Sequence, residues 1–505
     1  MHVGMVLEMA SDGLAGRTAL GSRKDGLSFE ELGRRARRAG TLLAGRPGGH
    51  VVFVDENSIA LPIALFGAAV AQKPFVPVNY RLADDRLRAI VERVAPATVI
   101  AGRGVAERLE GLDGLDLLGR QEFLDLVGDD GVEESDGWGC DPEATAVLLF
   151  TSGTTGEPKG AVLRHRNLAS YLVSSVEFGG AGEDEAAIVS VPPYHIAAVA
   201  SVLSATYAGR RVVMLEAFDP VLWVQTARAE AATHAMVVPT MLGRILDVVD
   251  ADGAGLPSLR SLAYGGGPMP ASVVERALAL LPGVDLVNAY GLTETASTIA
   301  LLGPDDHRQA FASDDPAVRA RLGSVGQPLP GVEISIRDAN DQPVPAGERG
   351  EIWVRGDQVS GEYLGGATTD GDGWFRTRDG GYLDDDGFLF VDGRLDDVIV
   401  RGGENLSPGE IEEVLTAHPA VESAAVVGIP DAQWGERVVA AVVTVPGASV
   451  TEEELRQHVL GMLRSARTPE RIQLMGELPF NENGKLLRRV LREDLASAFG
   501  SDPAG

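Results

Sequence analysis

The chain has 505 residues, of which 45% are hydrophobic and 23% are charged, and its formal net charge at pH 7 is −29. This length and composition predict a globular protein of roughly two to four domains with large cores. The negative charge argues against a general nucleic-acid binder and against a partner of anionic membranes. A local positive loop can still hold a small anion.

The single cysteine and the short apolar runs exclude several further classes. Cys140 alone cannot form a disulfide within the chain or a cysteine-rich metal site, and without a matching motif we interpret it as structural. No basic segment followed by an apolar core precedes the first helix-like segment, so no signal peptide is expected. The longest apolar run, residues 59–71, contains Pro62 and is too short to span a bilayer, which predicts a buried helix. We therefore expect a cytoplasmic protein without a membrane span.

The N-terminal part of the sequence alternates strand-like with helix-like segments. Ser28, with Glu31 three residues later, predicts a capped helix start. Strands are predicted for six apolar segments, which are residues 50–55, 98–101, 187–191, 211–215, 235–238 and 261–264. This alternation predicts α/β layers with largely parallel sheets.

After about residue 322 the pattern changes to short strands separated by turn residues. Strands at 332–337, 349–355 and 387–391 predict a small antiparallel or barrel-like region. The Asp- and Gly-rich segment 370–397 resembles an EF-hand in composition only, because its spacing lacks the third ligand and the closing glutamate.

From residue 394 a new unit begins. Its predicted helices are residues 408–418 and 451–463, the second capped by Thr451 with Glu454, and its predicted strands are residues 420–427 and 437–445. These elements predict an α+β module of roughly 110 residues, a common size for a small domain.

Four segments that are far apart in the sequence carry residues suited to nucleotide chemistry. The first, TSGTTGEPKG at 151–160, follows an apolar run, and its glycines, hydroxyls and Lys159 suit phosphate oxygens. It is not the common nucleotide loop, because Pro158 precedes the lysine and Gly160 follows it. A surface turn is the alternative. The other segments are NAYGLTET at 288–295, WFRTRD at 374–379 with GRLDD at 393–397 and RGGEN at 401–405, and NGK at 483–485.

The joint occurrence of these segments, in this order, resembles the adenylate-forming superfamily. That superfamily contains AMP-forming acyl- and aryl-CoA ligases, carrier-protein adenylation domains and beetle luciferases, and the resemblance covers residues 27–491. It implies a large N-terminal domain at residues 1–395, made of layered α/β subdomains and a small β-barrel-like region. A small mobile α+β domain at residues 396–505 would follow, with a hinge near Asp396 that lets it rotate between two poses.

The resemblance implies a reaction in two steps. A carboxylate attacks the α-phosphate of ATP to give an acyl-adenylate and pyrophosphate, and the thiol of CoA then displaces AMP to give an acyl-CoA thioester. The first step brings anions together, so it requires positive charge, oriented donors and a divalent ion. ATP, Mg²⁺ and CoA are therefore the expected cofactors.

Five residues receive roles in the chemistry from the resemblance. Lys485 would contact the substrate carboxylate and the bridging oxygen of the α-phosphate, stabilising charge that peaks in the transition state. Glu294 and Thr151 would hold Mg²⁺, and Thr293 would contact the α-phosphate. His195 matches the family's aromatic position beside the acyl pocket and the thiol entry. Considered one at a time, these residues have commoner explanations, such as a solvated lysine or an exposed helix-cap glutamate.

The resemblance also implies a nucleotide site and a thiol channel. Tyr290 would stack on adenine, with Gly266 and Gly267 allowing the backbone to lie against the base. Asp379 would accept both ribose hydroxyls, and Arg394 would lie near ribose or phosphate. A core tyrosine and a surface ion pair are the alternatives. The further binding residues are Thr151, Ser152, Gly153, Thr154, Thr155 and Lys159 for the phosphates, Asn288, Ala289 and Gly291 near the base, and Gly402, Gly403, Glu404 and Trp434 along the thiol channel.

The sequence departs from the family at three places. Arg378 stands where the family usually has glycine, and Asn483 stands where many relatives have threonine. In CoA-using relatives the segment equivalent to 465–470 often carries an aromatic residue and several basic residues, whereas here only Arg467 remains and Glu470 has the opposite charge. CoA is therefore the expected acceptor, with an acyl carrier protein or another non-CoA acceptor as the alternative.

The acid site is expected to be apolar, neutral and fairly roomy. No aspartate suited to a substrate ammonium stands near 193–200, and the expected lining is residues 237–241 and 265–267 with Ala289 and Ser297. A fatty, aromatic or polycyclic monocarboxylate is expected, because a dicarboxylate would require an arginine.

A non-catalytic nucleotide-binding relative is an alternative from a different class. The retained Lys485, Glu294 and Asp379 argue against it. The expected partners are the acid, ATP and CoA or a carrier protein, with no nucleic acid, and a homodimer is left open.

Overall fold

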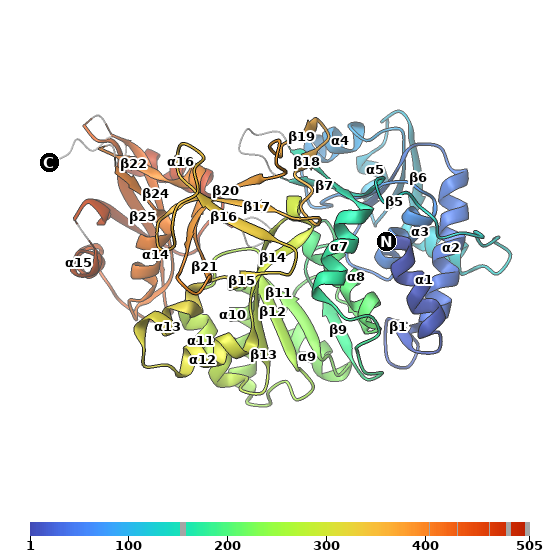
Figure 1. The fold of residues 1–505 in the computed structure, drawn as a ribbon, viewed down its shortest axis with the longest axis horizontal. Coiled ribbons are helices and arrows are strands. Elements are labelled where there is room, and N and C mark those ends of the chain that lie inside the picture. The colour runs from blue at the N-terminus through green and yellow to red at the C-terminus, as the bar shows by residue number, and fades with distance from the viewer. Residues whose placement is uncertain (152–157, 403, 432, 464, 481–485, 500–505) are drawn as a thin grey trace.

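A computed structural model describes residues 1–151, 158–402, 404–431, 433–463, 465–480 and 486–499. In these ranges the strands form four sheets, and Figure 1 shows the helices and strands of the N-terminal part at one end and the smaller C-terminal unit at the other. The prediction of a large α/β part followed by a small α+β domain is confirmed. Within the described ranges, no helix combines the length and apolarity that a membrane crossing requires.

One sheet of the large part carries the strands beside the phosphate loop. Its order is β19-β18-β8-β7-β4-β3-β5-β6, and the pairs between β7 and β6 are parallel, whereas β8, β18 and β19 are antiparallel to their neighbours. The bounds are β3 (His50–Val54), β4 (Phe75–Pro77), β5 (Ala97–Ala101), β6 (Leu115–Gly119), β7 (Thr145–Thr151), β8 (Lys159–Arg164), β18 (Glu362–Tyr363) and β19 (Gly366–Ala367).

A second sheet carries the strands beside the adenine-binding segment. Its order is β15-β14-β13-β12-β11-β9-β10-β1-β2, parallel from β13 to β1 and antiparallel at its edges. The bounds are β1 (Thr18–Leu20), β2 (Leu27–Ser28), β9 (Ala186–Val189), β10 (Arg211–Met214), β11 (His234–Val237), β12 (Ser261–Gly265), β13 (Asp285–Leu292), β14 (Ser297–Leu302) and β15 (Gln327–Pro328). The expectation of largely parallel sheets is therefore confirmed.

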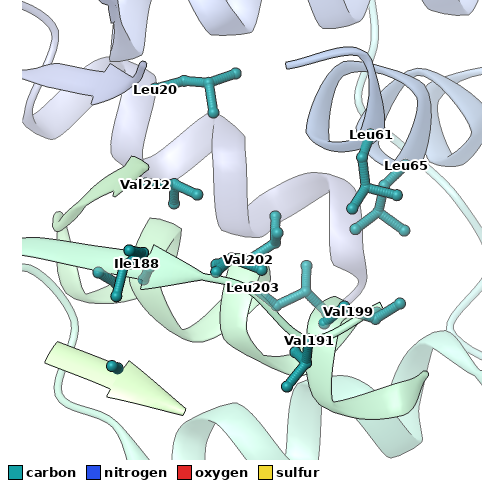
Figure 2. Packing of buried hydrophobic residues seen from close by; sticks show 14 of the residues in the cluster. Leu20, Leu61, Leu65, Ile188, Val191, Val199, Val202, Leu203 and Val212 are labelled. Carbon is teal, nitrogen blue, oxygen red and sulfur yellow. The ribbon is translucent and has the colours of Figure 1, made fainter. Parts of the chain in front are cut away.

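Helices cover these two sheets and join them through a shared core. They are α1 (Val3–Gly13), α2 (Phe29–Gly45), α3 (Ala60–Val70), α4 (Asp84–Glu92), α5 (Val105–Arg108), α6 (Arg120–Gly128), α7 (His165–Ser175), α8 (Ile196–Ala208), α9 (Pro220–Ala229), α10 (Pro239–Asp252), α11 (Ala271–Leu280), α12 (Pro304–Ala312) and α13 (Pro316–Ala320), with 3₁₀ turns η1 (Thr293–Thr295) and η2 (Arg321–Gly323). Ser28 caps α2 as predicted, its hydroxyl accepting from the Glu31 N–H at 3.1 Å. Figure 2 shows aliphatic side chains of α3 and α8 and of the β9–β10 region gathered in one core.

The apolar run 59–71 is α3, and every residue of this helix is buried, as predicted. Its close approach to α2 depends on a small residue, because a Cβ added to Gly67 would lie 2.5 Å from the Cβ of Ala39. A helix that is buried all round serves as a core element between the layers rather than as a surface element.

The third sheet is antiparallel, in the order β16-β17-β20-β21, as the change of pattern after residue 322 predicts. Its strands are β16 (Glu333–Arg337), β17 (Gly350–Arg355), β20 (Phe375–Leu383) and β21 (Leu389–Arg394). Strand β20, which carries Asp379, is not among the strands predicted from the sequence.

The C-terminal unit follows the turn η3 (Leu395–Asp397). It contains β22 (Ile399–Arg401), β23 (Glu404–Leu406), α14 (Pro408–Thr416), β24 (Val421–Asp431), β25 (Gly435–Thr444), α15 (Glu452–Met462), η4 (Ser465–Arg467), β26 (Arg471–Met475) and α16 (Arg488–Phe499). Thr451 and Glu454 form the expected capping box of α15. Buried side chains on the two faces of this sheet form cores of their own, packed against the helices of the unit.

Candidate active site

The two strands that flank the predicted phosphate loop are neighbours in the first sheet. β7 ends at Thr151 and β8 begins at Lys159, and these two residues are paired in register. The Thr151 hydroxyl donates to the Lys159 carbonyl at 3.4 Å. Ser152, Gly153, Thr154 and Thr155 lie outside the described residues. The structure thus places both ends of the loop side by side at the edge of the parallel strands.

Glu294, the predicted metal ligand, lies in the turn η1 that follows β13. Its backbone carbonyl accepts hydrogen bonds from the N–H groups of Ser360 (2.9 Å) and Gly361 (3.2 Å). Its carboxylate oxygen Oε1 accepts a hydrogen bond from the hydroxyl of Tyr363, which lies on β18 and pairs with Ala161 of β8. Glu294 is therefore held against the strand that begins at Lys159. Tyr363 is not among the site residues predicted from the sequence, because only the non-local pairing of β18 with β8 gives it a place in the site.

The predicted ribose and adenine residues form one hydrogen-bonded cluster. The hydroxyl of Tyr290 donates to Oδ2 of Asp379 at 2.6 Å, and Nε of Arg394 lies 3.0 Å from Oδ1 of the same carboxylate. Asp379 is 6% exposed, and its N–H donates to the Thr377 hydroxyl at 3.1 Å. Burial, and then the charge of Asp379, raise the pKa of Tyr290 well above its ordinary value, so this phenol remains a donor.

Small residues allow the backbones beside this cluster to approach closely. Gly265 ends β12, and a Cβ added there would lie 2.2 Å from the carbonyl oxygen of Ala289 on β13. Gly266 follows with φ of +83°, a conformation that glycine adopts without steric cost. Asn288 has a structural contact, its Nδ2 donating to the Ser324 carbonyl at 3.0 Å. Gly265, which directly precedes the two predicted adenine-binding glycines, is therefore adjacent to β13.

His195 precedes helix α8, with its ring 5.6 Å from that of Tyr194. A cavity of about 290 Å³ is lined by Pro192 and Pro193, close to His195 in the chain, and by Val238, Thr240 and Met241 from the segment predicted to line the acid site. The other predicted lining residues, at 265–267 and at Ala289 and Ser297, do not line this cavity.

The cavity differs from the expected neutral site in carrying charge. Arg81, Glu216 and Arg244 line it and are exposed. The guanidinium of Arg244 lies 5.5 Å from the ring centroid of Phe218, and no carboxylate of the described residues pairs with it. The two arginines are not among the site residues predicted from the sequence, because α10 and the loop after β4 are far apart in the chain.

The inner lining of the cavity includes a buried polar group with spare bonding capacity. Asn57 is 1% exposed, and its Nδ2 donates to the carbonyls of Val191 (2.9 Å) and Leu215 (3.1 Å). Its Oδ1 is buried without a hydrogen-bond partner in the described part of the chain. An unpaired buried acceptor is costly, so this position favours a ligand that brings an N–H or O–H donor.

The C-terminal unit contributes Phe480 to the same cavity. Phe480 forms an isolated bridge with Leu486, and the Leu487 N–H donates to the Pro479 carbonyl at 2.7 Å. Lys485 and Asn483 lie outside the described residues, but the residues on both sides of that segment are thus next to each other, with Phe480 at the cavity.

The predicted thiol-channel residues are close together in the C-terminal unit. Gly402 has φ of +58°, its N–H donates to the Trp434 carbonyl at 2.7 Å, and a Cβ there would lie 2.9 Å from the Trp434 ring. Glu404 lies 3.7 Å from Arg467, which also donates to Glu410. Gly403 lies outside the described residues. The single basic residue retained in 465–470 is therefore already paired with carboxylates.

Arg378, the departure from the family's glycine, has φ of +61°, which is unfavourable for a residue with a side chain. Its Nη1 lies 3.9 Å from Oδ2 of Asp396 in η3, the turn between β21 and the C-terminal unit. The strained residue thus connects β20 with the segment in which the hinge is predicted.

The predicted metal site fits Mg²⁺ rather than a metal held by a protein cage. Within the described ranges there is no group of three or more His, Cys, Asp or Glu side chains that could enclose an ion. Glu294 supplies one carboxylate and Thr151 one hydroxyl beside the phosphate loop. Mg²⁺ typically binds through one or two carboxylates together with substrate phosphates, and this donor set matches that pattern.

Two family models match the chain: the AMP-binding enzyme over residues 7–364 and the AMP-binding enzyme C-terminal domain over residues 410–485. A feruloyl-CoA synthase from Amycolatopsis sp. is 34% identical over 474 residues, covering 92% of this chain and 93% of that protein. The fatty acid–[acyl-carrier-protein] ligase ScoC from Streptomyces coeruleorubidus is 32% identical over 489 residues, covering 92% and 91%. Among solved structures, the o-succinylbenzoate CoA synthetase (MenE) from Bacillus subtilis with its acyl-adenylate intermediate matches with a TM-score of 0.83 and 28% identity, covering 96% of this chain and 97% of that one.

Proposed function

The chain belongs to the family of AMP-binding enzymes, and from this premise we propose that it is an AMP-forming acid–thiol ligase. It activates a carboxylic acid with ATP, releases pyrophosphate, and transfers the acyl group from the adenylate to CoA. The observation that carries the proposal is the Tyr290–Asp379–Arg394 cluster, because these three residues come from three strands and meet where the nucleotide is expected.

The first step joins a carboxylate oxygen to the α-phosphorus and breaks the bond to the pyrophosphate. Asp379 retains lone pairs for the ribose hydroxyls, since each carboxylate oxygen can accept more than one hydrogen bond. Thr151 and Lys159 lie where the loop ends and would contact the departing phosphates. Mg²⁺, when bound beside Glu294, neutralises phosphate charge. Lys485 supplies the cation at the carboxylate in this proposal.

The second step brings a thiol to the adenylate, and the cavity lined by Pro192 and Pro193 supports an approach from that side. Asn57 Oδ1 is a buried acceptor without a hydrogen-bond partner among the described residues. The arm that carries the thiol of CoA contains amide N–H groups that can donate to such an acceptor. The same arm is attached to acyl carrier proteins, so the cavity supports either acceptor. We propose CoA as the acceptor and retain the carrier protein as the alternative, since Arg467 is occupied by Glu404 and Glu410.

For the acid, we propose a fatty or aromatic carboxylate. The wall residues Val238 and Met241 and the prolines 192 and 193 offer apolar contact. A dicarboxylate is a second candidate, because Arg244 on the cavity supplies the cation that a distal carboxylate would need. This second candidate departs from the expectation of a neutral site.

An ATP–pyrophosphate exchange panel tests the proposed first step. It contains a fatty acid, a hydroxycinnamate, 2-succinylbenzoate and an amino acid, with Lys485→Ala as the inactive control. We expect exchange with one of the first three acids and none with the amino acid. Exchange that is best with amino acids, or absent with every acid, would contradict the proposal.

A thioester assay with the best acid then separates the two acceptors. Free CoA and a holo carrier protein are supplied at equal thiol concentration, and the product is identified by mass. We expect acyl-CoA. Acylation of the carrier protein alone would establish the alternative.

A further inference from the structure

Tyr363 touches both the metal-binding carboxylate and the phosphate-loop strand. Its hydroxyl donates to Oε1 of Glu294, and its ring centroid lies 5.7 Å from the Lys159 ammonium. In the described part of the chain, the second carboxylate oxygen of Glu294 receives no hydrogen bond. One tyrosine therefore contacts two residues predicted to serve the phosphates and Mg²⁺, although the sequence motifs do not include it.

The backbone around Tyr363 is fixed to β8 on both sides. Tyr363 pairs with Ala161, and the Leu364 N–H donates to the Gly160 carbonyl at 2.9 Å. The neighbouring Glu362 accepts two hydrogen bonds from the guanidinium of Arg164, at 2.9 Å each. Such a two-point ion pair is among the stronger and more directional polar contacts. The position of the phenol is thus set by the same strand that begins at Lys159.

The hydroxyl of Tyr363 is the donor in its bond to Glu294, because an ionised carboxylate can only accept. A phenol that donates to one carboxylate oxygen restricts the rotation of the glutamate side chain and leaves the other oxygen available to a ligand. A glutamate side chain loses rotational freedom when it is fixed in one orientation, and here that loss occurs before any ion binds.

We propose that Tyr363 is a positioning residue, which orients Glu294 for Mg²⁺ and couples the metal site to the strand carrying Lys159. The inference rests on the proposed function for the identity of the ion and the phosphates. Partners in the outer shell of metal ligands typically contribute 10- to 100-fold in metal affinity. The hydroxyl orients the metal ligand by its hydrogen bond to Glu294, and the face of the ring contacts the Lys159 ammonium.

Tyr363→Phe isolates the hydroxyl, because it retains the ring and its contact with Lys159. The matched control is Tyr382→Phe on β20, whose ring stacks on Phe390 at 4.7 Å. Each variant is titrated with ATP by calorimetry, once with Mg²⁺ and once with EDTA. In Tyr363→Phe, the ratio of ATP affinity with Mg²⁺ to ATP affinity with EDTA should fall by roughly 10-fold or more. The affinity measured with EDTA should be unchanged.

The exchange assay provides a second measurement. In Tyr363→Phe, the Mg²⁺ concentration for half-maximal exchange should rise roughly 10-fold or more, with most of kcat restored at high Mg²⁺. In a Glu294→Gln background the tyrosine change should add nothing further, because the pair acts as one unit. Tyr382→Phe should behave as the wild type.

Two outcomes would overturn the proposal. The first is a Mg²⁺ dependence in Tyr363→Phe equal to that of Tyr382→Phe. The second is an equal loss of metal-free and metal-dependent ATP binding, which would mean that the hydroxyl supports the fold or the nucleotide instead. If no acid supports exchange in the wild type, the proposed function fails, and the calorimetric comparison still decides the role of Tyr363.

Discussion

The hydroxyl of Tyr290 donates a 2.6 Å hydrogen bond to Oδ2 of Asp379, although 89 residues separate the two in the chain. Tyr290 lies on β13 of the nine-stranded sheet and Asp379 on β20 of the antiparallel sheet. Arg394, the register partner of Asp379 on β21, faces the other carboxylate oxygen. The bond therefore joins two sheets at the predicted nucleotide site, and the carboxylate is oriented before ATP binds.

Tyr290→Phe tests this orientation, because it removes the hydroxyl and keeps the ring. A hydrogen bond to a charged group contributes about 1.5–3 kcal/mol, so we expect a loss of that order in the free energy of unfolding. ATP should also bind more weakly, because the Asp379 carboxylate is no longer oriented before ATP binds. Each 1 kcal/mol of binding free energy lost in this way weakens the affinity roughly fivefold. Urea unfolding and ATP titration measure the two effects. Unchanged ATP affinity together with reduced stability would show that the bond only joins the sheets.

A second prediction concerns acid stability. Burial lowers the pKa of His165 to about 4, and its Nδ1 accepts a hydrogen bond from the Val3 N–H at 3.3 Å. A histidine with a folded pKa below its unfolded value of 6.5 contributes stability that is fully present above pH 6.5 and lost as the pH falls toward 4. We expect His165→Asn to flatten the loss of stability between pH 6.5 and 5, measured by urea midpoints. An equally steep decline in the variant would assign the pH dependence to other groups, among which His234 has a similarly lowered pKa of about 4.

Much of the fold could be predicted because local signals are strong. The caps at Ser28 and Thr451 and the apolar run of α3 depend on neighbours in sequence, and each element forms where it was expected. Strand β20 was missed because Gly380 and Gly381 interrupt its alternation. The position of β20 in the sheet is set by its pairing with β17 and β21, and such pairing cannot be predicted from a local sequence pattern.

The site was predictable as a set of motifs but not as a set of contacts. The motifs predict Tyr290, Asp379 and Arg394 as site residues, yet the contacts among the three side chains arise only when three strands meet. Tyr363 and Arg244 were missed for the same reason, since each acquires its place from an element distant in sequence. The assigned chemical roles of these residues stay predictions.

A third prediction follows from the backbone of Arg378. A side chain at φ of +61° costs roughly 1–2 kcal/mol relative to glycine, whereas the exposed ion pair with Asp396 contributes about 0–1 kcal/mol. Arg378→Gly should therefore be about 1 kcal/mol more stable to urea than Arg378→Ala, which loses the charge and keeps the strain. Equal stabilities of the two variants would mean that the backbone relaxes when the arginine is removed.

A fourth prediction tests whether Arg244 binds a distal carboxylate of the acid substrate. If a distal carboxylate of the substrate reaches this residue, Arg244→Gln should reduce kcat/KM for a dicarboxylate by roughly 10-fold or more, because a hydrogen bond between charged groups contributes about 1.5–3 kcal/mol. The kcat/KM for a monocarboxylate should be nearly unchanged. Glu216→Gln, which changes another charge of the same cavity, is the control. An equal loss for both acids would place Arg244 beside a group common to both reactions, such as the acceptor.

The fifth prediction concerns Lys485 and rests on the contacts of the described residues on either side of its segment. Phe480 lines the cavity and bridges to Leu486, so the described residues on either side of the segment that contains Lys485 lie next to each other, with Phe480 at the proposed acid site. Removing a charge that acts in the transition state typically costs about 100- to 1,000-fold in rate. Lys485→Ala should lose that much pyrophosphate exchange and still bind ATP, because Asp379, Tyr290 and Lys159 belong to the large domain. Arg489→Ala, which removes an exposed cation four residues later, should retain full exchange. Full exchange by Lys485→Ala would remove this lysine from the chemistry, and loss of ATP binding would move it to the nucleotide.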